Sequence, residues 1–218
     1  MNKFILLSTF MFSTIIIAQL QLDIQLKENL ENDGNISKKN TIILTFTNNS
    51  DNDMVFPLNT EGIRPLFDGE DCIQKQKEFE INNAMPIINL KLNGKPVEFG
   101  RGLHHIDTNI PYDKPKTQNF YSSLIFIKAH QKFKYQLYFN PHEFYDNANE
   151  VFYWYYQTQK NIKYDLQIKF CINENVYKKL TKKQRKTLSN YKLYKGILHS
   201  NEINYNENID YADDFIAK

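Results

Sequence analysis

The chain has 218 residues, of which 27 are Lys or Arg and 25 are Asp or Glu, so its formal net charge at pH 7 is +2. A charge this close to zero argues against a nucleic-acid-binding protein, because such proteins neutralise phosphates with a marked excess of cations. About 200 residues are enough to bury one core. We therefore expect a single domain.

Residues 1–18 have the pattern of a secretory signal peptide. Lys3 precedes an apolar stretch, and the small residue Ala18 stands before the polar residue Gln19. Serine and threonine interrupt this stretch, whereas a membrane span needs ~20 apolar residues. We expect cleavage before Gln19 and a secreted or periplasmic mature chain with 26 basic residues, 25 acidic residues and no transmembrane anchor. The alternative is an uncleaved membrane anchor.

Period-two alternation predicts strands in the first part of the mature chain. Residues 22–26 alternate, and in residues 41–47 Ile42, Leu44 and Phe46 point one way. Turn-forming residues occupy positions 48–53. A short strand over residues 54–58 follows them.

Residues 60–118 form the predicted insertion. They hold five of the seven glycines and five of the seven prolines, which indicates a long irregular segment. Inside it, Asn93-Gly94 separates two apolar runs, and this pair is the strongest short hairpin signal.

The last part of the predicted domain, which spans residues 19–200, contains further strands and one short helix. Strands are predicted over residues 124–127, 133–139, 152–156, 164–172 and 194–200. Thr181 and Gln184 have the spacing of a capping box at the start of a helix before the last strand. Residues 201–218 read as an acidic, frayed tail.

The two cysteines, Cys72 and Cys171, lie far from any zinc-binding spacing. In an oxidising compartment such a pair most simply forms one disulfide. Cys171 also falls on the polar face of its predicted strand, which favours the bridge. Two buried free thiols are the alternative.

Predicted strands separated by turns, with almost no helix, indicate an all-β protein folded as an antiparallel β-sandwich. Residues 42–56 resemble the second strand, turn and third strand of secreted bacterial immunoglobulin-like (Ig-like) modules, including the proteinase-inhibitor type. Tyr164-x-Leu166-x-Ile168 is similar to their tyrosine-corner strand, and Leu92-Asn93-Gly94-Lys95 to one of their hairpins. The resemblance implies an Ig-like sandwich.

One departure limits what the resemblance implies. Where such modules often carry Pro-Gly before the strand that contains Leu137, this chain has Ala129-His130-Gln131. The expectation therefore covers the fold and does not extend to proteinase inhibition.

The aromatic run over residues 152–156 is the best candidate for a binding surface. In a strand, Phe152, Trp154 and Tyr156 would face the core, and Tyr153 and Tyr155 would lie side by side on the opposite face. Phenol rings on a surface suit both sugars and protein partners. The alternative is that the insertion covers this second face.

A run of cations without an acid between residues 178 and 195 is a second candidate, with Lys182, Lys183, Arg185 and Lys186 at its centre. Such a patch could meet an anionic glycan or lipid head group. The alternative is a solvated helix face whose charge balances the acidic tail.

Two clusters of potential ligand residues occur in the sequence, and neither pattern predicts a metal site. Adjacent residues on a strand point opposite ways, so His104 and His105 could not hold one ion there together with Asp107. The carboxylates of Asp51 and Asp53 lack the glycine and distal glutamate of a calcium loop, so a turn is preferred.

We predict no cofactor and no catalytic residue, because the sequence contains no recognisable hydrolase, metalloprotease or phosphate-binding motif. Carboxylate pairs for glycoside hydrolysis stay open. The sequence thus favours a non-enzymatic binding or accessory protein outside the cytoplasm. The alternative is a carbohydrate-binding or glycan-processing protein that uses Tyr153 and Tyr155.

Overall fold

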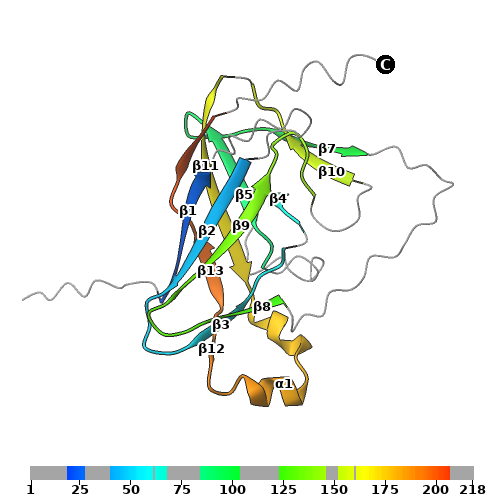
Figure 1. The fold of residues 1–218 in the computed structure, drawn as a ribbon. Helices are drawn as coiled ribbons and strands as arrows, with labels where there is room; N and C mark the ends of the chain where they lie inside the picture. Colours follow the sequence, from blue (N-terminus) through cyan, green and yellow to red (C-terminus); the bar gives the residue numbers. More distant parts are fainter. Residues whose placement is uncertain are drawn as a thin grey trace, which may run out of the picture.

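The computed structural model describes residues 19–27, 40–60, 62–67, 84–103, 123–145, 152–159 and 161–206. These residues are mainly strands in antiparallel sheets, with one short α-helix near the C-terminal end (Figure 1). The predicted all-β class is therefore confirmed. Residues 1–18, which carry the predicted signal peptide, lie outside the described part of the chain.

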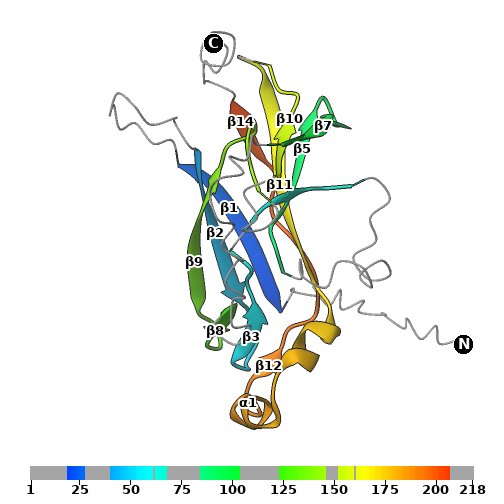
Figure 2. The same ribbon diagram turned by 90° about the vertical axis from the view of Figure 1, so that its right-hand side faces the viewer.

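The main body consists of two facing sheets, seen edge-on in Figure 2. The first sheet has the order β1-β2-β9 and the second has the order β13-β11-β5-β4, with β14 also paired to β11 and β6 to β5. The bounds of these strands are β1 Leu20–Lys27, β2 Asn40–Asn48, β4 Arg64–Pro65, β5 Ile87–Leu92, β6 Lys95–Pro96, β9 Lys132–Phe139, β11 Lys163–Ile172, β13 Gly196–His199 and β14 Ile203–Asn206.

The core lies between these two sheets. As predicted, Ile42, Leu44 and Phe46 of β2 all point inward, and each is fully buried. The ring of Phe46 lies 5.6 Å from that of Phe170 on β11 and 4.8 Å from that of Phe56, measured between centroids. Phe46 therefore joins the two layers.

The polar turn after β2 is held by the buried side chain of Asn48. Its amide group donates hydrogen bonds to the carbonyls of Asn52, Ile127 and Lys128, and its side-chain oxygen accepts from the backbone N–H and the hydroxyl of Ser50. A buried amide needs such partners, because an unsatisfied one costs free energy. The predicted turn is thus fixed by one asparagine.

The predicted hairpin is present between β5 and β6. Asn93 and Gly94 both have positive φ, at 51° and 75°, as the tightest two-residue hairpin turn requires. However, β5 pairs with β11 and β4 inside the second sheet, and Ile87 and Ile88 are fully buried. The prediction of a long irregular insertion is therefore wrong for this segment, because two-sided burial makes it part of the sandwich.

The prediction that the tail begins at residue 201 is also wrong. Residues 203–206 form β14, and Tyr205 is completely buried. Asn201 lies between β13 and β14, and its side-chain amide exchanges two hydrogen bonds with the backbone of Ile24 on β1. This segment closes one edge of the sandwich, and its acidic composition concealed the apolar alternation.

A smaller sheet and the helix form one end of the molecule (Figure 1). The sheet has the order β12-β3-β8, with bounds Lys192–Leu193, Met54–Pro57 and Leu124–Ile127. A 3₁₀ helix, Glu174–Lys179, precedes α1, Lys182–Thr187, and the predicted capping box of Thr181 and Gln184 is present. Among the described residues, no helix is both long enough and apolar enough to cross a membrane.

Two buried tyrosines predict that the fold weakens in alkali. Tyr156 donates to the carbonyl of Ile88 and Tyr177 to that of Tyr194, and burial raises the pKa of both phenols above the ordinary value of 10.0. The folded state therefore keeps protons that the unfolded chain loses, so the free energy of unfolding should fall as pH rises above about 10.

Urea unfolding between about pH 8 and about pH 11 measures this fall. The double substitution Tyr156→Phe and Tyr177→Phe should flatten the pH profile, whereas Tyr138→Phe, at a site that is 58% exposed, should leave it unchanged. A profile equally steep in the double variant would contradict the assignment to these two phenols.

Candidate functional site

The strand that holds the predicted aromatic surface is β10, Phe152–Tyr156, and it pairs with β7, Phe99–Leu103. The two strands form a separate antiparallel ribbon at the end of the molecule opposite α1 (Figure 1). In its register Tyr153 is opposite Gly102 and Tyr155 is opposite Gly100. Each candidate tyrosine thus faces a glycine.

The two tyrosine rings lie on the bare backbone of these glycines. A Cβ atom built at Gly100 would come within 2.4 Å of the Tyr155 hydroxyl, and one at Gly102 within 2.1 Å of the Tyr153 ring. The two rings are 6.2 Å apart and tilted by 46°, and both side chains are half-buried. Gly100 and Gly102 therefore leave room for the two rings, and a side chain at either position would occupy that space.

The opposite face of the ribbon packs toward the core. The ring of Trp154 lies 5.4 Å from that of Phe67 and 5.8 Å from that of Phe99, and the Arg101 guanidinium stands 5.4 Å from the indole ring. Trp154 remains half-buried, so it lies at the margin of the core and not inside it. The predicted division of faces holds for Tyr153, Trp154 and Tyr155, whereas the Phe152 side chain lies outside the described residues.

The ribbon is anchored to the sandwich at the Tyr156 end. Tyr156 is buried, its ring stacks 5.5 Å from that of Phe144, and its hydroxyl donates to the Ile88 carbonyl of β5. Trp154 and Phe144 also exchange two backbone hydrogen bonds. A pocket of about 410 Å³ lies beside this anchor, lined by residues of β5 and β6 together with Phe99 and Tyr156. The rings of Tyr153 and Tyr155 are therefore held on a fixed support.

Sequence reasoning missed Gly100 and Gly102 as part of this surface. A usable signal was present, because the two glycines are two residues apart, as are the two tyrosines. Both tyrosines lie opposite a glycine only if β7 and β10 pair in the register that the structure shows. The pairing joins strands about 50 residues apart, and local patterns do not indicate it.

Substitutions on the two faces of the ribbon should differ in their effect on stability. Trp154→Ala removes three ring or cation contacts and should cost about 2 to 3 kcal/mol, less than the ~3 to 5 kcal/mol of a fully buried aromatic residue. Tyr153→Ala and Tyr155→Ala remove a cross-strand contact and should each cost about 1 kcal/mol. Chemical denaturation of the three variants measures these losses, and equal losses would mean that both faces are equally packed.

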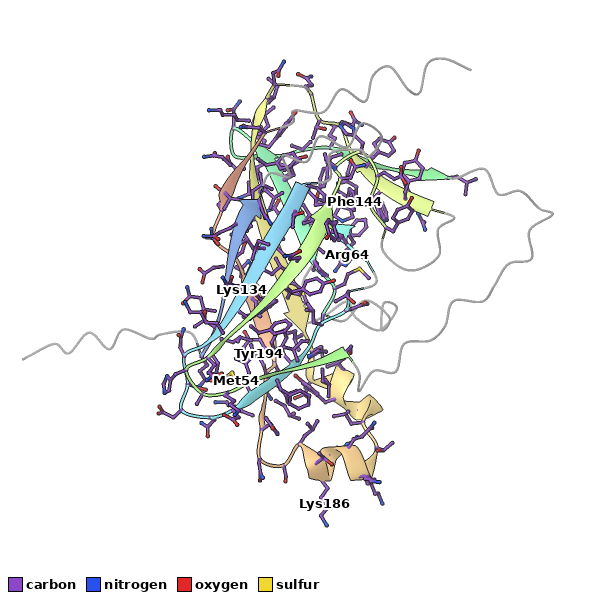
Figure 3. The ribbon with its side chains drawn as sticks, viewed as in Figure 1. Met54, Arg64, Lys134, Phe144, Lys186 and Tyr194 are labelled. Atoms are coloured by element: carbon purple, nitrogen blue, oxygen red, sulfur yellow. The ribbon has the colours of Figure 1, made fainter. Side chains whose placement is uncertain are left out.

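The second predicted patch lies at the other end of the molecule. Lys182, Lys183, Arg185 and Lys186 are all exposed on α1, and Figure 3 shows Lys186 pointing away from the sandwich. The guanidinium of Arg185, however, donates to the backbone carbonyls of Leu180 and Lys178. Arg185 therefore closes the turn between the two helices, and the lysines form the outward charge.

Of the two clusters considered as metal sites, the structure describes the one formed by Asp51 and Asp53. Asp53 accepts a hydrogen bond from the backbone N–H of Ala129, and Asp51 contacts the His130 ring, so both carboxylates belong to the turn. No group of three or more potential ligand side chains lies together in this part of the chain. His104, His105 and Asp107 lie outside the described residues.

The polar face expected around Cys171 is covered. Cys171 is only 4% exposed and packs with Ile87 against the partly buried side chains of Leu66 and Ile197. No described cysteine has a free thiol. Cys72 lies outside the described residues, so its pairing with Cys171 stays a prediction.

The chain matches no protein-family model and no curated protein.

Proposed function

We propose that this chain is a non-enzymatic binding protein, secreted or periplasmic, whose contact surface is the tyrosine face of the β7–β10 ribbon. Tyr153, Tyr155, Gly100 and Gly102 make up this tyrosine face. The proposal of export is based on the signal-peptide pattern of residues 1–18. The proposed partner is a macromolecule outside the cytoplasm.

The seating of the two rings on the glycines is the observation that carries the proposal. Tyrosine provides a large flat contact area with a polar hydroxyl and little rotamer entropy to lose, so it is common in binding hot spots. Here the orientation of both rings is already set by the ribbon backbone. A partner would therefore meet a preorganised surface, which lowers the entropic cost of binding.

We further propose that the sandwich is Ig-like. In Ig-like folds, strands A, B and E lie in one sheet and strands C, F and G in the other. Strands β1, β2 and β9 of the first sheet would correspond to A, B and E. Strands β5, β11 and β13 of the second sheet would correspond to C, F and G. Tyr164 near the start of β11 accepts a hydrogen bond from the backbone N–H of Gln159, five residues upstream, like a tyrosine corner. Binding through loops and ribbons at the end of a sandwich is common for such modules.

Carbohydrate binding is the second candidate function. Neighbouring phenols 6.2 Å apart offer two apolar faces with hydroxyl groups, and a sugar ring has apolar faces and hydroxyl edges that could match them. The same tyrosines would carry both functions, so the chemistry of the captured partner distinguishes them.

An affinity capture experiment tests the proposed function. Immobilised mature chain should retain a component of the envelope extract of its own cells, and Tyr153→Ala with Tyr155→Ala should lose it. Tyr138→Ala, at an exposed tyrosine on β9, is the matched control and should retain it. Protease treatment of the extract separates a protein partner from a glycan. Retention that is unaffected by the double substitution would contradict the proposal.

A further inference from the structure

A second surface, distinct from the tyrosine face, lies at the α1 end of the molecule. Phe126 on β8 is 44% exposed and Leu193 on β12 is 38% exposed, although both are large apolar side chains. The Tyr191 ring lies 5.1 Å from that of Phe126 in an edge-on arrangement. We call Phe126, Tyr191, Leu193 and the lysines of α1 the basic tip.

The small sheet brings the apolar members of the basic tip to one face. Val55 in β3 is opposite Phe126 on one side and Leu193 on the other. Side chains of directly paired residues point to the same face of a sheet. Phe126 and Leu193 therefore flank Val55, which is fully buried in the core cluster, as are Met54 and Phe56 of the same strand.

The cations of the basic tip lie at the same end of the molecule as these apolar side chains (Figure 1). Lys182, Lys183 and Lys186 on α1 are exposed, and α1 has no buried residue. Lys192 is also exposed and precedes Leu193 directly, with its backbone N–H donating to the carbonyl of Asp53. The residues of α1 bury no side chain, so their charges face solvent, while the capping box stabilises the first turn and the C-cap Leu188 is buried in the core.

The nearby acids do not neutralise these lysines. Glu174 pairs with Lys195 at 3.3 Å. Asp53 accepts from the Ala129 N–H, and Asp51 contacts His130. Among the described residues, no acid forms an ion pair with Lys182, Lys183 or Lys186, so no direct contact compensates their positive charge.

We propose that the basic tip binds peripherally to an anionic phospholipid surface. Lysines near a negatively charged bilayer gain free energy from its surface potential, and aromatic and aliphatic side chains beside them enter the interface. A soluble polyanion would match the lysines but would leave Phe126 and Leu193 without a role. Charge and apolar exposure together therefore favour a lipid surface as the occupant.

The basic tip and the tyrosine face lie at opposite ends of the sandwich, so the molecule could hold to a membrane at one end and to a partner at the other (Figures 1 and 2). The lipid proposal is independent of the tyrosine face. Failure of one leaves the other standing, because their substitutions lie on different elements.

Co-sedimentation of the mature chain with vesicles tests the proposal. Vesicles of phosphatidylcholine with about one third phosphatidylglycerol should bind the protein, and vesicles of phosphatidylcholine alone should not. Lys182→Glu with Lys183→Glu and Lys186→Glu should weaken binding on the order of 100-fold. Phe126→Ala should weaken it about tenfold. Binding should also fall steeply with added salt, since the lysines are exposed.

Matched controls keep these results specific. Lys132→Glu with Lys134→Glu removes exposed cations from β9, and Tyr138→Ala removes an exposed ring there. Both variants, and Tyr153→Ala with Tyr155→Ala, should bind vesicles like the wild type. Leu193→Ser is a second apolar test if Phe126→Ala does not fold, as judged by its thermal melt.

Three outcomes would overturn the proposal. The first is no binding of wild-type protein to anionic vesicles. The second is full binding by folded Phe126→Ala and Leu193→Ser, since charge alone would then explain it. The third is a pair of results obtained with inorganic polyphosphate. Polyphosphate would displace the protein from vesicles, and Phe126→Ala and Leu193→Ser would bind polyphosphate as tightly as the wild type. These results would identify a soluble polyanion as the ligand.

Discussion

Phe46→Ala is expected to lower the free energy of unfolding by about 3 to 5 kcal/mol, the usual cost of deleting a fully buried aromatic ring. Phe46 is completely buried and contacts Phe56, Phe133 and Phe170, with ring centroids 4.8, 6.3 and 5.6 Å away. Its removal opens a cavity between the two sheets at the point where they meet. Little can fill this space, because the neighbouring rings are held by their own strands.

Urea unfolding of purified mature chain measures the effect. Phe126→Ala is the matched control, because Phe126 is 44% exposed, and it should cost no more than about 1 kcal/mol. Similar losses for the two variants would show that the sheets are not packed through Phe46.

Loss of the predicted disulfide between Cys72 and Cys171 should be the other large effect. The bridge would close a loop of about 100 residues, and the chain-entropy account gives up to ~4 to 5 kcal/mol for a loop of this length. Cys171 is 4% exposed on β11, the strand at the centre of the second sheet. The bridge would thus tie residues outside the described part of the chain to a strand in the middle of the fold.

Peptide mapping without reductant should detect the linked peptides, and Cys72→Ala should lower the melting temperature strongly. A reductant should have the same effect on the wild type and no further effect on the variant. Two free thiols in protein recovered from an oxidising compartment would contradict the pairing.

Local sequence patterns predicted the strands well, because each pattern has a local physical cause. The alternation in β2 follows from one buried face. The turn at Asn93-Gly94 could be predicted because Asn and Gly tolerate the positive φ that both positions require. The capping box at Thr181 and Gln184 needs only the first turn of a helix. Such features require no knowledge of distant residues.

The features that the sequence did not predict depend on distant partners. β7 is recognisable only through its pairing with β10, and the two residues of β12 only through their parallel pairing with β3. β14 was hidden by the charge of its surroundings, although Tyr205 is fully buried against Phe139 of the first sheet, 5.9 Å away. Tertiary contacts decided these elements, not propensity.

The candidate surfaces show the same division. The opposite orientation of Tyr153 and Tyr155 relative to Trp154 follows from the period of a strand, and it could be predicted. The close fit of the rings on the glycines and the exposed pair of Phe126 and Tyr191 could not be predicted, because they arise where separate segments meet. For each surface, the structure thus adds residues from a second segment that the sequence pattern did not connect with the first.

Chemical footprinting of the tyrosines tests the central claim most directly. Wild-type mature chain would be nitrated with and without envelope extract of its own cells, and the extent at each tyrosine quantified by mass spectrometry. Tyr138, which is 58% exposed on β9, serves as an internal reference. We predict that the extract protects Tyr153 and Tyr155 and leaves Tyr138 unchanged. Equal nitration of Tyr153 and Tyr155 in both samples would contradict a binding function for the β7–β10 ribbon.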